Sequence, residues 1–134
     1  MEKNSITTSV EQSEKLLELG IDPNTASMMW VSLGKKCVWI RNSVPYKDKE
    51  KDKFYAYRPA WTLEDLLKIV GNETCGHIVF RIFANGAADI HITCGYGILQ
   101  VGSSPDESYL NLLVRSLYQH YVNKYYYEKE QHNN

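Results

Sequence analysis

The stretch that decides the fold is Tyr57-Arg58-Pro59-Ala60-Trp61-Thr62-Leu63-Glu64-Asp65-Leu66-Leu67-Lys68-Ile69-Val70-Gly71. Thr62 is a good N-cap residue, because its hydroxyl can accept a hydrogen bond from a free backbone N–H of the first helical turn. Asp65 stands three residues later, where its carboxylate can reach back to the cap. One apolar helix face follows, formed by Leu63, Leu66, Leu67 and Val70. With Gly71 as the stop, the pattern predicts a helix over about residues 63–70.

The residues around the cap predict a packing role for this helix. Trp61 and Leu66 have the spacing of a hydrophobic staple, and Pro59 biases the preceding chain toward an extended conformation. A short helix with one leucine stripe must bury that stripe, so we expect it to pack against a sheet.

Length and composition indicate one globular domain over residues 1–134, with flexible ends at 1–7 and 128–134. Of the 134 residues, 43% are hydrophobic and 23% are charged, and the net charge of −1 argues against a broad basic surface for nucleic acid. The 3 cysteines are an odd number, unlike a disulfide framework. No stretch has the pattern of a membrane span or a signal peptide, so we expect a cytoplasmic protein.

Upstream, Thr8-Ser9-Val10-Glu11 is a capping-box pattern that predicts a helix over about 9–19, ended by Gly20. Asp22-Pro23 predicts a single helical turn. Residues 28–33 and 37–41 predict a hairpin, and a short strand follows at 54–57. The alternating charges of residues 47–53 predict a solvated loop between them.

Downstream, Asn85-Gly86 predicts a hairpin between residues 76–83 and 88–94. A strict two-residue turn would place Ile78 and Phe80 on the face of Asp89 and His91, so we expect a register slipped by one residue. A third strand follows at 98–101. Ser104-Pro105-Asp106-Glu107 then predicts a helix over about 105–122.

These elements predict an α+β fold. We expect a small antiparallel sheet, made of the meander 76–101 and the N-terminal strands, packed against two or three helices.

Two clusters of polar residues invite chemical interpretations. Cys75, His77, His91 and Cys94 are ligand types for zinc, but their spacings are not those of zinc sites. Asp89 and His91 could form an acid–base pair, with Arg81 near His91 in the slipped register. Catalysis also needs a pocket and a third positioned group. We therefore predict no catalytic residue, no metal and no cofactor, and keep a small enzyme using Asp89 and His91 as the weakest alternative.

The best candidate for an interaction surface is a cluster of tyrosines near the C-terminus. It comprises Tyr118, Tyr121, Tyr125, Tyr126 and Tyr127. Tyrosine is enriched at interface hot spots. The alternative is that Tyr118 and Tyr121 belong to the core and that the other three form a frayed helix end.

A nucleic-acid-binding accessory protein is the main alternative function. It would need a basic face made of Lys35, Lys36, Arg41 and the lysines of 47–53. The order helix–strand–strand–strand–helix also matches a double-stranded-RNA-binding domain. Such domains need lysines at the start of the last helix, where this chain has Ser104-Pro105-Asp106-Glu107.

Residues 9–26 and 59–67 resemble segments of a family of small uncharacterised proteins, which are encoded in prophage-like and other mobile elements of gut Bacteroidetes. The quoted motifs are caps, a staple and leucine stripes. The resemblance implies a mobile-element origin and a bacterial cytoplasm, and it transfers no activity to any residue. The tyrosine cluster and the lack of a convergent catalytic set predict a non-enzymatic accessory protein of such an element, which binds an unidentified protein partner or forms a homodimer, with no membrane contact.

Overall fold

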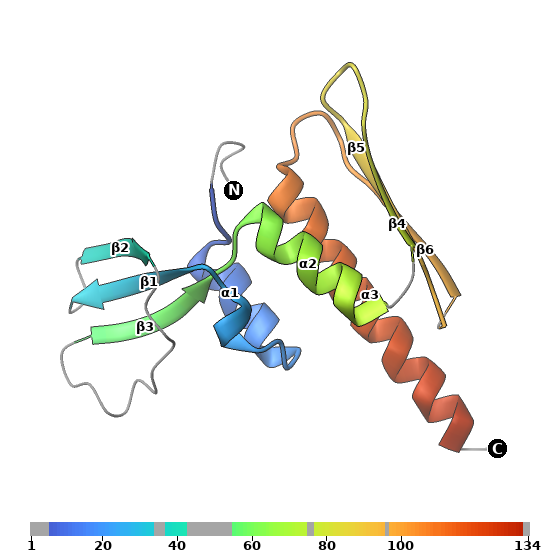
Figure 1. Cartoon of the computed structure of the whole chain (residues 1–134), viewed down its shortest axis with the longest axis horizontal. Coiled ribbons are helices and arrows are strands. Elements are labelled where there is room, and N and C mark those ends of the chain that lie inside the picture. The colour runs from blue at the N-terminus through green and yellow to red at the C-terminus, as the bar shows by residue number, and fades with distance from the viewer. Residues whose placement is uncertain (1–5, 34–36, 43–54, 75–76, 96, 133–134) are drawn as a thin grey trace. The chain divides into compact units, whose positions relative to one another are not determined.

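A computed structural model describes residues 6–33, 37–42, 55–74, 77–95 and 97–132 (Figure 1). The elements follow in the order α1 (Val10–Glu18), a 3-10 turn (Pro23–Thr25), β1 (Met28–Leu33), β2 (Cys37–Asn42), β3 (Tyr55–Ala60), α2 (Leu63–Thr74), β4 (His77–Ile82), β5 (Ala88–Cys94), β6 (Gly97–Gly102) and α3 (Tyr109–His132). The α+β prediction is confirmed. The predicted loop at 47–53 lies outside the described residues.

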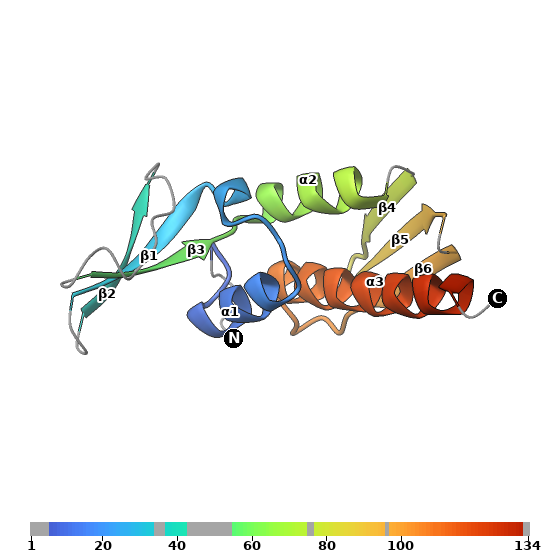
Figure 2. The ribbon, with the colours of Figure 1, turned by 90° about the horizontal axis from the view of Figure 1, so that it is seen from below.

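The strands form two antiparallel sheets of three strands each, with orders β2-β1-β3 and β4-β5-β6 (Figure 2). This differs from the single sheet that the sequence suggested, because the N-terminal strands pair only among themselves. The Cα positions group into two compact units, Ser5–Asp65 and the part from Leu66 onward, so the boundary falls in the first turn of α2. Each unit is described by itself below.

Helix α1 begins one residue later than the capping pattern predicted. The N-cap is Ser9, whose hydroxyl accepts from the Gln12 N–H while the Gln12 side chain accepts from the Ser9 N–H. At the other end Gly20 has φ +89°, and the N–H groups of Gly20 and Ile21 donate to the carbonyls of Leu17 and Leu16. This is a Schellman motif, and it confirms Gly20 as the stop.

Thr8 is not the cap because its polar groups are engaged elsewhere in the first unit. Its N–H donates to the Trp61 carbonyl at 2.8 Å, and its hydroxyl accepts from the Trp61 N–H at 3.1 Å. The same hydroxyl lies 2.8 Å from the Ser13 hydroxyl, and the Trp30 indole donates to the Thr8 carbonyl. Thr8 is fully buried, so these bonds satisfy groups that water cannot reach.

The predicted hairpin of β1 and β2 is confirmed, and β3 pairs with the other side of β1. Met29 and Val31 of the central strand are buried, as is Ala60 of β3. The strand predicted at 54–57 continues through Pro59, which is compatible with pairing because β3 is an edge strand.

The predicted cap of α2 is confirmed. The Asp65 N–H donates to the Thr62 hydroxyl at 3.1 Å, and Asp65 accepts from the Thr62 N–H at 3.0 Å. The predicted stop at Gly71 is wrong, because the helix continues to Thr74. Gly71 does not have a positive φ, and a Cβ there would lie 3.6 Å from the Ile78 side chain of β4. At that distance a Cβ would make an ordinary van der Waals contact with Ile78, so the position does not require glycine.

The register of the second sheet confirms the predicted slip. Phe80 pairs with Ile90 and Ile78 with Ile92, so the isoleucines share one face. The slip comes from a turn in which Gly86 has φ +91° and donates to the Phe83 carbonyl. Ile90 and Ile92 are fully buried on the face that carries the helices (Figure 1).

Helix α3 differs from the predicted 105–122 at both ends. Ser104-Pro105-Asp106-Glu107 forms a turn, closed by the Glu107 N–H to the Ser104 carbonyl, and the N-cap is Ser108, which accepts from the Asn111 N–H. The helix then runs to His132, because nothing between Tyr109 and His132 breaks it. Residues 128–132, assigned from sequence to a flexible tail, are helical. None of the described helices has the length and apolar character needed to cross a membrane.

Candidate functional site

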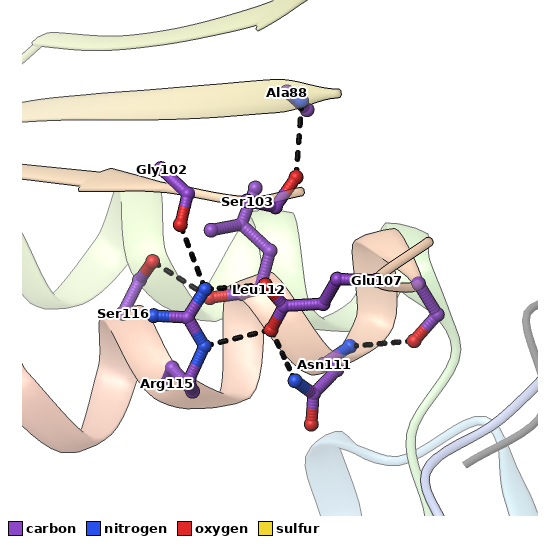
Figure 3. Close-up of polar contacts among 9 residues, drawn as sticks. Ala88, Gly102, Ser103, Glu107, Asn111, Leu112, Arg115 and Ser116 are labelled. Atoms are coloured by element: carbon purple, nitrogen blue, oxygen red, sulfur yellow. Dashed lines mark hydrogen bonds and ion pairs between the residues drawn. The ribbon is translucent and has the colours of Figure 1, made fainter. Parts of the chain in front are cut away.

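A polar brace ties the start of α3 to the end of β6 (Figure 3). Arg115 donates to both carboxylate oxygens of Glu107, at 2.7 and 2.5 Å, and to the Gly102 carbonyl at 2.8 Å. Glu107 also accepts from the Asn111 side chain. The hydrogen bonds from Arg115 are the main reason that the pKa of Glu107 lies below its usual range. Through the brace, the side of α3 that carries Arg115 is fixed beside the end of β6.

Beyond this brace α3 carries four exposed tyrosines, Tyr118, Tyr125, Tyr126 and Tyr127, which we call the tyrosine surface. We define the tyrosine stripe as Tyr118, Val122 and Tyr125, which follow Arg115 at intervals of three, four and three residues and so lie on one side of the helix. Tyr118 is 52% exposed and Tyr125 is 62% exposed. The Tyr126 ring, also exposed, meets the Tyr125 ring edge to face at 5.6 Å. The exposed Tyr118 ring and the exposed Tyr125–Tyr126 pair thus lie along α3, with the half-buried Val122 between them.

The core-facing side of α3 ends before the tyrosines do. Buried residues run from Ser108 to His120, and none follows among the described residues. The next positions on that side, Lys124, Glu128 and Gln131, are polar or charged. With 24 residues, α3 is about 36 Å long, whereas six-residue strands span about 20 Å. The helix is thus longer than the strands, and none of its described residues after His120 is buried.

The five tyrosines predicted as a surface do not share one environment. Tyr118, Tyr125, Tyr126 and Tyr127 are exposed, whereas Tyr121 is half-buried beside His120 and Lys124. The alternative that placed Tyr118 in the core does not agree with its exposure. Sequence reasoning missed the role of Arg115, whose link to Gly102 joins residues that are 13 positions apart.

Asp89 and His91 lie on the sheet face opposite the buried isoleucines. The Asp89 carboxylate is bound by the Arg81 guanidinium through two hydrogen bonds of 2.8 and 2.5 Å. These bonds hold the pKa of Asp89 below its ordinary value. The His91 Nε2 is 3.8 Å from Asp89 and 3.4 Å from Arg81. The geometry is that of an ion pair beside a histidine, with the carboxylate occupied by arginine.

The other polar candidates are only partly described. No group of three histidine, cysteine, aspartate or glutamate side chains within the described ranges could hold a metal ion, and Cys75 lies outside those ranges. The residues of the possible basic face, Lys35, Lys36 and the lysines of 47–53, also lie outside them. Arg41 is placed only as a member of β2.

Comparisons with known proteins give no family for this chain. No family model, no curated protein and no solved structure matches it. The tyrosine surface of α3 is therefore defined by its geometry alone.

Proposed function

We propose that this protein is a non-enzymatic accessory protein that acts by binding another protein chain through the tyrosine surface of α3. The observation that carries the proposal is the exposure of Tyr118 and, after the last buried residue His120, of Tyr125, Tyr126 and Tyr127 on α3. The resemblance in residues 9–26 and 59–67 supports a mobile-element origin and a bacterial cytoplasm as the setting.

The chemistry of the surface favours a protein partner. Tyrosine presents a large rigid ring with a polar tip, so it gains contact area at a small cost in side-chain entropy. The stripe lies on a regular helix that is anchored at its start by the Arg115–Glu107 brace. Such a helix presents its aromatic residues in a fixed order, as helix-in-groove recognition requires.

Site-specific photo-crosslinking tests the proposal. A photoreactive phenylalanine analogue replaces Tyr125 in one variant and Val79 in another. Val79 is 51% exposed on β4 and pairs with His91, so it lies on the sheet face opposite the buried isoleucines and α3. We expect adducts with a protein chain from position 125 and few from position 79. Tyr118→Ser, introduced beside the probe, should reduce the adducts severalfold.

Folding is monitored in parallel by circular dichroism, so that a loss of adducts cannot be ascribed to unfolding. Equal adduct yields from positions 125 and 79, in folded protein, would contradict the proposal. An adduct with RNA or DNA in place of protein would move the alternative function, nucleic-acid binding, to the front.

A further inference from the structure

The outer edge of β6 is the second exposed feature next to the tyrosine stripe. Strand β6 pairs with β5 and with no other strand among the described residues. Its sequence, Gly97-Ile98-Leu99-Gln100-Val101-Gly102, contains no charge and no proline. Ile98 is 77% exposed. Edge strands are normally protected by charges, prolines or a covering element, so an uncharged edge invites another strand to pair with it.

The hydrogen bonds at the end of β6 define which of its backbone groups face outward. The Ser103 N–H donates to the Ala88 carbonyl on β5 at 2.8 Å. Because backbone groups alternate direction along a strand, those of Val101 and Leu99 also face β5, and those of Gly102, Gln100 and Ile98 face away. The Gly102 carbonyl accepts a hydrogen bond from Arg115 and not from β5, as this alternation requires. Ile98 and Gln100 therefore present both N–H and C=O groups at the outer edge.

The tyrosine stripe lies along the same edge. Helix α3 starts near the end of β6 and runs back beside it (Figure 1). Arg115, which begins the stripe, bonds to the outward carbonyl of Gly102. Ile98 stands four residues from Gly102, about 13 Å along the strand, and Tyr125 stands ten residues from Arg115, about 15 Å along the helix. The edge and the stripe thus form one continuous surface.

We infer that a second copy of this chain occupies this surface, with β6 pairing antiparallel to β6 of the other copy and the two α3 stripes facing each other. This inference rests on the proposed function, since it names the partner of the same tyrosine surface. A two-fold axis beside Leu99 pairs Ile98 of one copy with Gln100 of the other. The outward groups then form four backbone hydrogen bonds, and the two half-buried Leu99 side chains meet.

Charge favours pairing between the β6 edges of two copies over pairing at the β4 edge. In the β6 pairing no charged side chain faces another, because the strand carries none. The opposite edge strand, β4, carries Arg81 and His77 on one face, and charges of this kind disfavour strand pairing.

The surface area that a dimer would bury indicates that its interface includes both the β6 edge and the tyrosine stripe. The exposed parts of Tyr118, Tyr125 and Tyr126 amount to about 350 Å² in each copy if a buried aromatic side chain covers about 200 Å². Two copies would then bury about 700 Å², which is typical of a crystal contact. With the β6 edge included, the total is on the order of 1,200 Å², the lower limit of a stable interface.

Sedimentation equilibrium of the full chain tests the inference. We expect a mass near twice the 15.5 kDa of one chain at micromolar concentrations. Ile98→Lys places a charge on the β6 edge, and Gln100→Pro removes an outward N–H without removing a bond to β5. Each should raise the dimer dissociation constant at least about tenfold. Val79→Lys, at a 51% exposed position of β4, is the matched control and should change it less than about twofold.

Amide hydrogen exchange provides a second measurement that does not depend on a variant. The N–H groups of Ile98 and Gln100 should become protected as the protein concentration rises. Those of Phe80 and Ile82 face the outer edge of β4 by the same alternation, and they should exchange at a rate that does not depend on concentration.

The outcomes separate the inference from the proposed function. If the measured mass is that of one chain at every protein concentration up to about 200 µM, the second copy is not the partner. The photo-crosslinking at Tyr125 then tests the proposed function by itself. A dimer that is weakened by Tyr118→Ser and Tyr125→Ser but not by Ile98→Lys or Gln100→Pro overturns the β6 pairing and supports the tyrosine surface. A dimer that none of these variants weakens contradicts both.

Discussion

Replacing Asp65 should destabilise the first unit more than any surface change of the same charge. The Asp65 carboxylate is almost completely buried and accepts three hydrogen bonds from two residues that it connects. Oδ2 accepts from the Ser27 N–H at 2.8 Å and from the Thr62 N–H at 3.0 Å, and Oδ1 accepts from the Ser27 hydroxyl at 2.5 Å. One side chain therefore caps α2 and also holds the chain that leads into β1.

The expected loss in the free energy of unfolding follows from these hydrogen bonds. A hydrogen bond to a charged group contributes about 1.5–3 kcal/mol, and the contributions of bonds that share one acceptor are not additive. Asp65→Ala leaves two backbone N–H groups without their acceptor, so we expect a loss of about 3 kcal/mol in the free energy of unfolding. Asp65→Asn keeps one carbonyl oxygen and should lose about 1–2 kcal/mol.

The pH dependence gives a second test of the same site. Burial alone would raise the pKa of Asp65, but hydrogen bonds from Ser27 and Thr62 outweigh burial and hold that pKa below its usual value. A carboxyl group with a lowered folded-state pKa stabilises the protein above its unfolded-state pKa, which is about 3.9, and this stabilisation is lost as the pH falls through the folded-state value. Asp65→Asn should remove this part of the acid destabilisation.

The assay is urea unfolding followed by tryptophan fluorescence, at pH 7 and at a series of lower pH values. Trp30 and Trp61 lie in the same unit as Asp65 and report on it directly. Glu11→Gln is the matched control, because it removes an exposed acidic group from the first turn of α1, and it should cost less than about 0.5 kcal/mol. The reasoning is refuted if Asp65→Ala costs no more than this control.

Three further predictions concern single contacts. Thr8→Val should lower the free energy of unfolding by about 2 kcal/mol in urea titrations, because the buried N–H of Trp61 loses its acceptor; an unchanged value would contradict this. Gly86→Ala should lower the melting temperature at a cost of about 1 kcal/mol, because a side chain at φ +91° is strained; Ala87→Gly, next in the turn, is the comparison. Arg115→Ala and Glu107→Gln should show a coupling of about 1 kcal/mol in a double-mutant cycle, and additive losses would mean that the brace contributes no pairwise energy.

The sequence determined the local features of the fold, because each depends on a few neighbouring residues. The cap of α2 needs only Thr62 and Asp65, and the stop of α1 needs only Gly20 with the preceding turn. The slipped hairpin register also followed from the sequence. A strict two-residue turn would put Phe80 and Ile90 on opposite faces, whereas a slip of one residue puts them on the same face, and burial of one sheet face selects the slipped register.

Other features depended on partners that are distant in the sequence. Thr8 and Ser9 are both suitable N-cap residues for α1. Because Thr8 is hydrogen-bonded to Trp61, Ser9 is the residue that caps the helix. Ser104 has the sequence pattern of a cap, with Pro105 and Glu107 after it, but these residues form a turn before the helix and Ser108 is the cap.

The tertiary structure alone decided the division of the strands into two sheets and the environment of the tyrosines. Alternation along a strand shows which residues share a face, but it does not identify the neighbouring strand, since any strand can offer the same backbone groups. Helical spacing likewise aligned Tyr118 with Tyr125 without showing whether that side met the core. The position of α3, fixed by Arg115 and by the residues buried up to His120, left these rings exposed beside an uncharged edge.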